Sequence, residues 1–329
     1  MIKKRVLSGM QASGKLHLGN LVGALENWKK MQDEYECFYF IADWHALSTN
    51  YEDTGEIASN RLEIAADWLA AGLDPEKSTI FVQSHIPEHA VLHLFLSMIV
   101  PVPWLERNPT YKEKMENIQD KDLATYGFLG YPVLQAADIS LYKADYVPVG
   151  IDQLPHLELT RELVRRFNGI YRCNVLKEPE GKISEVPKLK GTDGRKMSKS
   201  YNNAIFLGEE PASVETKIKG MVTDTKRARR KDPGEPNDCN LFPLHKIYSS
   251  EEDIREICKG CRSAEMGCTD CKAMLLKNLL PAMAPIREKR KDFISKPDKI
   301  NEILVEGSKK ARLVAMATLE EVKAAMKIG

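Results

Sequence analysis

The sequence predicts an α/β fold in which a parallel sheet carries helices on both faces and is followed by a region of helices only. Short apolar segments alternate with amphipathic helical patterns over roughly the first hundred residues. From Pro211 onward only helical patterns remain. Strands separated by helices pair in parallel, and such sheets bind ligands at the carboxyl ends of their strands.

Apolar runs and helical periodicity define the elements of the first half. Residues 5–9, 37–42 and 78–83 are short and apolar, as strands buried on both faces require. Residues 17–33, 57–71 and 87–100 follow a helical pattern. In the first of these, one apolar stripe contains Leu18, Leu21, Val22, Leu25 and Trp28. Gly72 and Pro75 end the second helix.

Helical patterns in the second half of the sequence predict helices after Ser250, over residues 271–283 and over residues 308–326. We expect Ser308 to be the N-cap of the last of these helices. Residues 217–231 hold seven basic residues against one Asp. Such a run usually forms a solvated face, and the alternative is contact with nucleic-acid phosphates. The basic residues are Lys217, Lys219, Lys226, Arg227, Arg229, Arg230 and Lys231.

Length and charge exclude several classes of protein. The 329 residues suggest two domains, and 48 basic against 47 acidic residues exclude a generally cationic coat for nucleic acid. The apolar run at residues 90–103 is interrupted and too short to span a bilayer. The basic amino terminus leads into Ser8 and Gly9 rather than an apolar signal core. We therefore expect a soluble cytoplasmic protein that does not bind membranes.

The loop after the first strand suggests a nucleotide site. Residues 8–14, Ser-Gly-Met-Gln-Ala-Ser-Gly, are small enough for a phosphate to approach the backbone at the start of a helix. The loop matches neither a Walker motif nor GxGxxG, and the alternative is an ordinary strand–helix turn. His17, in the sequence His-Leu-Gly-Asn at residues 17–20, is suited to donate to a phosphate.

A second cationic segment lies far along the chain, at residues 196–200, Lys-Met-Ser-Lys-Ser. Two lysines three residues apart can neutralise a polyphosphate while negative charge moves to a leaving group. The alternative is a solvated basic loop.

Together these two segments resemble the class I aminoacyl-tRNA synthetases, in which they correspond to the HIGH and KMSKS motifs. The similarity narrows to the tryptophanyl branch through residues 8–14 (SGMQASG), 43–46 (DWHA), 131–139 (YPVLQAADI) and 147–153 (VPVGIDQ). Tyrosyl-tRNA synthetases are the nearest relatives with a related GxDQ. The resemblance implies a Rossmann-like catalytic domain at residues 1–205, a helical anticodon-binding domain at 206–300 and a carboxyl-terminal helix at 301–329 that packs back on the first domain.

The resemblance also implies roles for individual residues. The phosphates are stabilised by His17, Lys196 and Lys199. The expected ATP-binding residues are Gln11, Ser13, Gly19, Asn20, Lys112, Lys114, Gly150, Asp152, Met197 and Ser198. Lys112 and Lys114 could equally form an exposed helix face, and Asp152 could cap the following helix.

An indole is a flat apolar group with one N–H donor, so its pocket needs apolar walls and one well-placed acceptor. The resemblance gives this role to Asp138, with Leu7 and Tyr131 as walls and Gln135 beside the ring. Gln153 would meet the ammonium group of the amino acid, and His45 and Gln11 would lie near its carboxylate. The remaining alternatives are a helix-surface Asp138 and a structural His45 in the core.

Five of the seven cysteines fall within 33 residues, which in a reducing compartment favours metal ligands over disulfides. Cys239 with Cys261, Cys268 and Cys271 resembles the [4Fe–4S] pattern of a subset of tryptophanyl-tRNA synthetases. Cys258 in place of Cys239 would instead give two CxxC pairs suited to Zn²⁺. A chain without metal is the third alternative.

The implied reaction is activation of tryptophan with ATP and Mg²⁺, followed by transfer to the terminal ribose of tRNA(Trp). The resemblance further implies a homodimer with its interface in the catalytic domain. Three alternatives remain: tyrosine as the amino acid, an adenylyltransferase of the HIGH superfamily that acts without tRNA, and a noncatalytic RNA-binding paralogue.

Overall fold

A computed structural model describes residues 3–117, 122–183, 189–227 and 229–328. Five parallel strands form one sheet in the order β3-β2-β1-β4-β5 within this part of the chain. The strands are β1 (Arg5–Gln11), β2 (Glu36–Ala42), β3 (Ser78–Val82), β4 (Tyr146–Val149) and β5 (Glu180–Ile183). The predicted α/β class with a parallel sheet is therefore confirmed.

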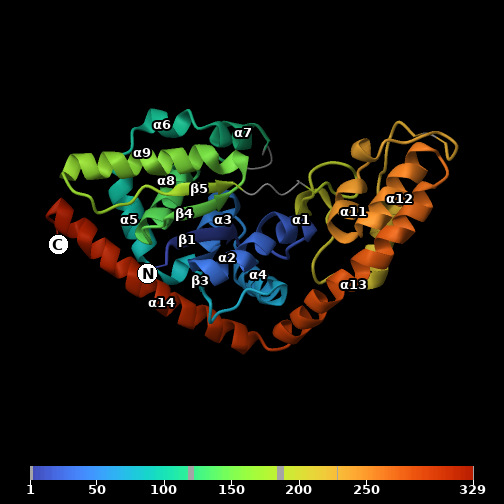
Figure 1. Ribbon diagram of the computed structural model, residues 1–329. Helices are drawn as coiled ribbons and strands as arrows, with labels where there is room; N and C mark the ends of the chain where they lie inside the picture. The colour runs from blue at the N-terminus through green and yellow to red at the C-terminus, as the bar shows by residue number, and fades with distance from the viewer. Residues whose placement is uncertain (1–2, 118–121, 184–188, 228, 329) are drawn as a thin grey trace.

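Helices surround the sheet and then continue away from it (Figure 1). The first nine are α1 (Leu18–Asn20), α2 (Glu26–Glu34), α3 (Asp43–Asn50), α4 (Ile57–Ala71), α5 (Glu88–Ser97), α6 (Val102–Glu106), α7 (Pro109–Asn117), α8 (Tyr126–Leu141) and α9 (Leu154–Tyr171). The others are α10 (Pro211–Gly220), α11 (Phe242–Tyr248), α12 (Glu251–Arg262), α13 (Cys268–Ile294) and α14 (Pro297–Met326). None of these described helices combines the length and the apolar character that crossing a membrane requires.

Side chains of β2 alternate between two hydrophobic cores because successive residues of a strand point to opposite faces. Tyr39 packs against Trp28 of α2, with ring centroids 4.6 Å apart and nearly parallel planes. Phe40, on the opposite face, packs against Phe81 at 5.7 Å. The first core joins the sheet to α2 and α4, and the second joins it to α5, α8 and α9. Helices thus cover both faces of the sheet, as predicted.

The predicted helix at residues 17–33 is divided in the structure. The helix α1 is followed by a wider π-helical turn at Leu21–Leu25, after which α2 begins. Such turns inside helices often occur beside functional sites. Here the turn directly follows the His-Leu-Gly-Asn segment.

The carboxyl-terminal helices are longer than predicted. The helix α13 starts three residues before residue 271, because the carboxylate of Asp270 accepts the free N–H of Gly267 at 3.1 Å. The expectation that Ser308 is an N-cap was wrong, because α14 begins at Pro297 and Ser308 lies inside it. The Ser308 hydroxyl instead donates to the carbonyl of Leu304, one turn earlier, at 2.6 Å.

Helix α14 crosses the edge strand of the sheet at very close range. A Cβ atom at Gly307 would lie only 1.8 Å from the carbonyl oxygen of Ile80 in β3. The Ser308 hydroxyl also accepts the backbone N–H of Val82 at 3.4 Å. Only a residue without a side chain permits this approach. The last helix therefore covers the outer strand of the sheet (Figure 1).

A buried ion pair connects α13 to α4 in the first half of the chain. The guanidinium of Arg290 in α13 donates to the carboxylate of Asp67 in α4 at 2.6 Å and also pairs with Glu63. The other oxygen of Asp67 accepts the backbone N–H of Leu16 at 2.7 Å. Burial raises the pKa of Asp67 to about 6, although Arg290 and Leu16 act to lower it. Three distant segments thus meet at one carboxylate.

We expect Arg290→Met to destabilise the protein by about 3–5 kcal/mol, because it leaves the carboxylate of Asp67 buried without its charge partner. Lys291→Met is the matched control, since Lys291 pairs with Glu210 at the surface, where both side chains are more than half exposed. Lys291→Met should lower the free energy of unfolding by only about 0–1 kcal/mol. Urea unfolding followed by circular dichroism measures both variants, and equal unfolding curves would contradict this account of α13.

Candidate functional site

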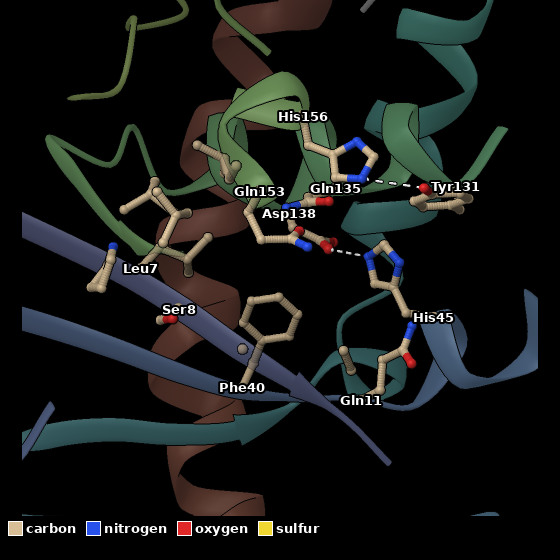
Figure 2. Close-up of a pocket in the computed structure, with 16 residues that line it drawn as sticks. Leu7, Ser8, Gln11, Phe40, His45, Tyr131, Gln135, Asp138, Gln153 and His156 are labelled. Atoms are coloured by element: carbon tan, nitrogen blue, oxygen red, sulfur yellow. Dashed lines mark hydrogen bonds and ion pairs between the residues drawn. The ribbon is translucent and has the colours of Figure 1, made fainter. Parts of the chain in front are cut away.

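A pocket of about 330 Å³ lies between α8 and the carboxyl ends of the central strands (Figure 2). Pockets of this size suit a small ligand. All six residues that the sequence predicted to bind an aromatic amino acid line it, namely Leu7, His45, Tyr131, Gln135, Asp138 and Gln153, and so does Gln11. The apolar walls from β1, β2 and β4 face the polar side chains of α8.

Asp138 is completely buried at the inner side of this pocket. Its Oδ2 accepts a hydrogen bond from Nε2 of His45 at 2.8 Å, and its Oδ1 accepts one from Nδ1 of His89 at 2.6 Å. The amide of Gln83 donates to both oxygens, at 2.8 and 3.0 Å. Burial acts to raise the pKa of Asp138, but the hydrogen bonds from His45 and His89 outweigh it and lower the pKa to about 2. The pocket therefore contains a permanently charged acceptor.

A second polar group lies across the pocket from Asp138. The ring of His156 contacts the Tyr131 hydroxyl through Nε2 at 3.2 Å and the Asn108 amide through Nδ1 at 3.1 Å. His156 and the ring of Phe40 both line the pocket (Figure 2). Sequence reasoning did not assign a role to either residue. The neighbouring VPVGIDQ segment was the only signal for His156, which follows it by three positions.

The His17 imidazole lies at the start of α1, as its N-cap, and is not among the residues that line the pocket. The backbone N–H of Asn20 donates to its Nδ1 at 3.3 Å, and the Asn20 side chain accepts the N–H of His17. Burial, together with the nearby charge of Lys196, lowers the pKa of His17 to about 4. Because Nδ1 is an acceptor, the hydrogen of the neutral ring sits on Nε2. His17 is therefore a neutral donor, with Nε2 free of this capping contact.

The His-Leu-Gly-Asn and Lys-Met-Ser-Lys-Ser segments converge in space, although almost 180 residues separate them. The segment after residue 203 pairs with the first loop, because the N–H of Leu18 donates to Ile205 and the N–H of Leu207 donates to Leu16, each at 2.9 Å. The ammonium of Lys199 donates to the carbonyl of Ser13 at 3.2 Å. Its Nζ would be only 2.7 Å from a Cβ atom at Gly14, which also has a positive φ of 100°.

Asn203 holds the Lys-Met-Ser-Lys-Ser loop in place, a role that the sequence did not reveal. Its amide donates to Asp193 at 2.7 Å and to the carbonyl of Lys196 at 3.1 Å. Its carbonyl oxygen accepts the N–H of Ser198 at 2.8 Å. Met197 is buried, and its Cβ lies 3.8 Å from a Cβ position at Gly19. One buried side chain thus fixes the backbone between the two lysines.

The other predicted nucleotide-binding residues lie around the same edge of the sheet. Gly150 follows β4, where a Cβ atom would stand 2.6 Å from the Asp152 carboxylate. The Asp152 side chain accepts from Gln153 at 3.3 Å and does not cap α9. Lys112 is exposed on α7, whose Thr110 hydroxyl contacts the carbonyl of Asp152 at 3.4 Å. The side chain of Lys114 lies outside the described part of the chain.

The basic residues at 217–231 do not form one continuous cationic surface. Lys217, Lys219 and Lys226 form ion pairs with the carboxylates of Glu209, Glu215 and Asp238. In contrast, a cavity of about 330 Å³ beside the start of α13 is lined by Arg227, Arg229 and Arg230 together with Gly267, Cys268, Thr269 and Asp270. Arg230 lies 3.9 Å from the Asp270 carboxylate, so an anion in this cavity would meet three guanidinium groups and one carboxylate.

Four cysteines gather beside this cavity. Burial and then the neighbouring thiols of Cys239, Cys261 and Cys268 raise the pKa of Cys271 to about 12. Cys271 also contacts Nε2 of His245 at 3.3 Å. Cys258 is not among the groups that shift the pKa of Cys239, Cys261 or Cys271. Among the residues that the structure describes, no three His, Cys, Asp or Glu side chains are arranged to hold a metal ion.

Comparison with known proteins connects this geometry to one family. The family described as tRNA synthetases class I (W and Y) matches residues 3–284. A tryptophan–tRNA ligase of Thermotoga maritima is 53% identical over 98% of this chain and 99% of its own length. One of Aquifex aeolicus is 42% identical over 98% of this chain and 100% of its own.

A solved structure shares the fold as well. The tryptophanyl-tRNA synthetase of Campylobacter jejuni, crystallised with ADP and tryptophan, superposes with a TM-score of 0.87 at 34% identity. The match covers 98% of this chain and 99% of that one.

The His17 imidazole should titrate with a pKa of about 4 and stay neutral from pH 5 upward, because burial and Lys196 both disfavour its charged form. Lowering the pH through 4 should charge it and remove the contact to the Asn20 N–H. NMR of the ring protons measures the midpoint, with His17→Gln to assign the signal. A midpoint near the ordinary value of about 6.5 would contradict this environment.

Proposed function

The chain belongs to the class I tRNA synthetases for tryptophan and tyrosine and, like its full-length relatives, is a tryptophan–tRNA ligase; from that premise we propose which residues carry out the reaction. The observation that supports this assignment best is the convergence of the two motifs: Lys199 contacts Ser13, and the charge of Lys196 acts on His17. The same sheet carries a pocket that contains the buried carboxylate of Asp138.

The pocket binds L-tryptophan. The indole ring lies between the apolar walls of Leu7 and Phe40, and its N–H donates to Asp138. A charged acceptor is suited to this role, because an aromatic side chain without the N–H would leave it without that partner, at a cost of roughly 10⁴-fold in selectivity. Gln153 and Tyr131 line the opposite side, where the ammonium group of the amino acid needs acceptors. His45 and Gln11 lie where its carboxylate emerges toward ATP.

Tyrosine was the alternative amino acid, and an adenylyltransferase without tRNA was the alternative enzyme. Full-length relatives that are 40–53% identical to this chain are all described as tryptophan–tRNA ligases. These relatives favour tryptophan and a tRNA-charging enzyme over both alternatives.

In the first step, a carboxylate oxygen of tryptophan attacks the α-phosphorus of ATP, and the bond to the β-phosphate oxygen breaks. Pyrophosphate leaves with the electron pair of that bond, and tryptophanyl-adenylate forms. No side chain needs to act as a nucleophile, because positioning and charge stabilisation provide the catalysis. Lys196, Lys199 and the Nε2–H of His17 stabilise the negative charge on the phosphates. Mg²⁺, which accompanies ATP, neutralises part of the same charge.

The nucleotide occupies the remaining edge of the sheet. The ribose lies against Gly150 and Asp152, where the glycine permits close approach and the carboxylate accepts from hydroxyls. Ser13, Gly19, Asn20, Met197 and Ser198 form the floor beneath adenine and phosphates. The exposed Lys112 on α7 is a further phosphate contact, and we assign the same role to Lys114, whose side chain lies outside the described part of the chain.

In the second step, the terminal ribose hydroxyl of tRNA(Trp) attacks the activated carbonyl, and AMP leaves. We assign adenylate chemistry to residues 1–205, anticodon recognition to residues 206–300 and a bracing role to the helix at 301–329. Arg227, Arg229 and Arg230 contact tRNA phosphates, since their cavity concentrates positive charge. Because charged tRNA is used by ribosomes, we place the enzyme in the cytoplasm.

Lys196→Ala and Lys199→Ala should each lower tryptophan-dependent ATP–pyrophosphate exchange by about 10²- to 10³-fold, because each removes charge from the leaving group. Tryptophan binding, measured by calorimetry, should survive. Lys190→Ala is the control, since Lys190 is exposed on the strand segment that faces Lys196. Normal exchange in both motif variants, or exchange driven equally by tyrosine in the wild type, would contradict the assignment.

We further propose that Cys239, Cys261, Cys268 and Cys271 hold a [4Fe–4S] cluster, with Zn²⁺ as the alternative metal. Four thiols suit either metal chemically. Their mutual influence on pKa supports Cys239 over Cys258 as the fourth member of the set. The cluster would brace the start of α13 beside the three arginines.

Protein purified without oxygen should be brown and contain about four iron atoms per chain. Cys239→Ser should lose the colour and the iron. Cys258→Ser, its matched control, should keep both. Retention of zinc instead of iron would select the alternative, and a colourless metal-free wild type would reject both metals.

We also propose that two copies of the chain associate through α5 and α6. Leu94, Met98 and Val102 are each at least half exposed and follow one another at intervals of four residues. Leu94 lies on α5, Met98 directly follows that helix and Val102 begins α6, so three exposed apolar side chains lie where one helix ends and the next begins. The resemblance to the synthetase family supports a second copy of the chain as its partner.

Wild-type protein should sediment at twice the 37.2 kDa of the chain. Met98→Glu should shift it to the monomer, because a charge in an apolar interface is costly. Leu313→Glu on α14 is the control, since Leu313 is as exposed as Met98. A monomeric wild type, or dissociation by the control variant alone, would contradict the proposal.

A further inference from the structure

We propose that His89 is a positioning residue for amino-acid selection: it holds the Asp138 carboxylate so that one oxygen faces the indole N–H of the substrate. This inference rests on the proposed binding of tryptophan in the pocket. His89 itself does not line the pocket and is completely buried behind Asp138. Its effect on the substrate therefore passes through Asp138.

The two oxygens of Asp138 have different surroundings. Oδ1 accepts from Nδ1 of His89 at 2.6 Å and from the amide of Gln83 at 2.8 Å. Oδ2 accepts from Nε2 of His45 at 2.8 Å and from the same Gln83 amide at the longer distance of 3.0 Å. Each oxygen therefore has two donors, but His45 lines the pocket and His89 does not. Oδ2 is thus the oxygen on the pocket side, where an indole N–H that reaches it replaces the longer contact from Gln83.

A buried tyrosine fixes which nitrogen of His89 carries the hydrogen. The Tyr142 hydroxyl lies 2.8 Å from Nε2 of His89, on the side away from Asp138. Burial raises the pKa of Tyr142 well above its usual value, so the hydroxyl keeps its proton. Nδ1 carries the hydrogen because the ionised Asp138 carboxylate can only accept, and the Tyr142 hydroxyl stabilises this tautomer by donating to Nε2. The chain Tyr142–His89–Asp138 thus has one direction of donation.

Aromatic packing keeps the His89 ring from rotating. Its centroid lies 6.1 Å from that of Phe40, 6.3 Å from that of Phe81 and 5.5 Å from that of Tyr142. With the ring fixed by these neighbours, the hydrogen bond at Oδ1 sets the plane of the Asp138 carboxylate. A fixed acceptor discriminates between substrates better than one that can rotate away from an unsuitable ligand.

The test compares L-tryptophan with 3-(benzothiophen-3-yl)-L-alanine, in which sulfur replaces the ring N–H with little change of shape. Exchange kinetics give kcat/KM for each amino acid at saturating ATP. The wild type should prefer tryptophan by about 10³-fold or more. His89→Leu should reduce this preference at least about tenfold, through a loss for tryptophan alone, with the KM for ATP unchanged. Tyr142→Phe should reduce it less, and His89→Asn, which keeps an amide donor near the position of Nδ1, should restore most of it.

His93→Leu is the matched control, because His93 lies one turn further along the same helix and its buried Nδ1 makes no hydrogen bond within the described part of the chain. It should leave the preference unchanged. If His89→Leu fails to fold, Tyr142→Phe and His89→Asn still carry the comparison. Equal losses for both amino acids, or an unchanged preference in Tyr142→Phe and His89→Leu, would overturn the role of His89. A wild type without preference for tryptophan would instead reject the proposed role of Asp138.

Discussion

The carboxylate of Asp67 connects the parts of the protein that must act together. It accepts the N–H of Leu16, the residue before His17, and the guanidinium of Arg290 on α13. Because a buried carboxylate is costly without such partners, the first loop, α4 and α13 are stabilised only in one mutual arrangement. The loop that follows β1 and the long helix that begins at Cys268 therefore share one buried contact.

That arrangement also brings the segments at residues 17–20 and 196–200 together. The segment that contains Ile205 pairs with the backbone on both sides of His17, and Gly208 lies against the Arg290 side chain. Lys199 reaches Ser13 from the opposite side. Ordinary backbone pairing thus positions the segment that carries Lys196 and Lys199, while both lysine side chains remain exposed.

The sequence predicted helices and strands most accurately where a residue with a strong local preference, such as a glycine after a helix, marks the end of the element. The bounds of α4 match the prediction because Gly72 adopts a left-handed conformation, with φ at 105°, immediately after the last helical residue. Strand β4 was not predicted, because four residues that include Pro148 carry a weak strand signal. Ser308 resembled an N-cap in sequence, yet packing against β3 extends the helix through it. The six pocket residues came from motifs shared with a family, whereas His89 and Asn203 act through partners that only the folded chain brings near.

We propose above all that the His17 imidazole and the Lys199 ammonium bind the triphosphate of ATP beside a pocket that accepts an indole ring. A crystal structure of the enzyme with tryptophan and a non-hydrolysable ATP analogue tests it most directly. The account predicts phosphate oxygens between Nε2 of His17 and Nζ of Lys199, with the indole nitrogen within hydrogen-bond distance of Asp138. Tryptophan bound away from Asp138, or phosphates out of reach of both His17 and Lys199, would contradict it.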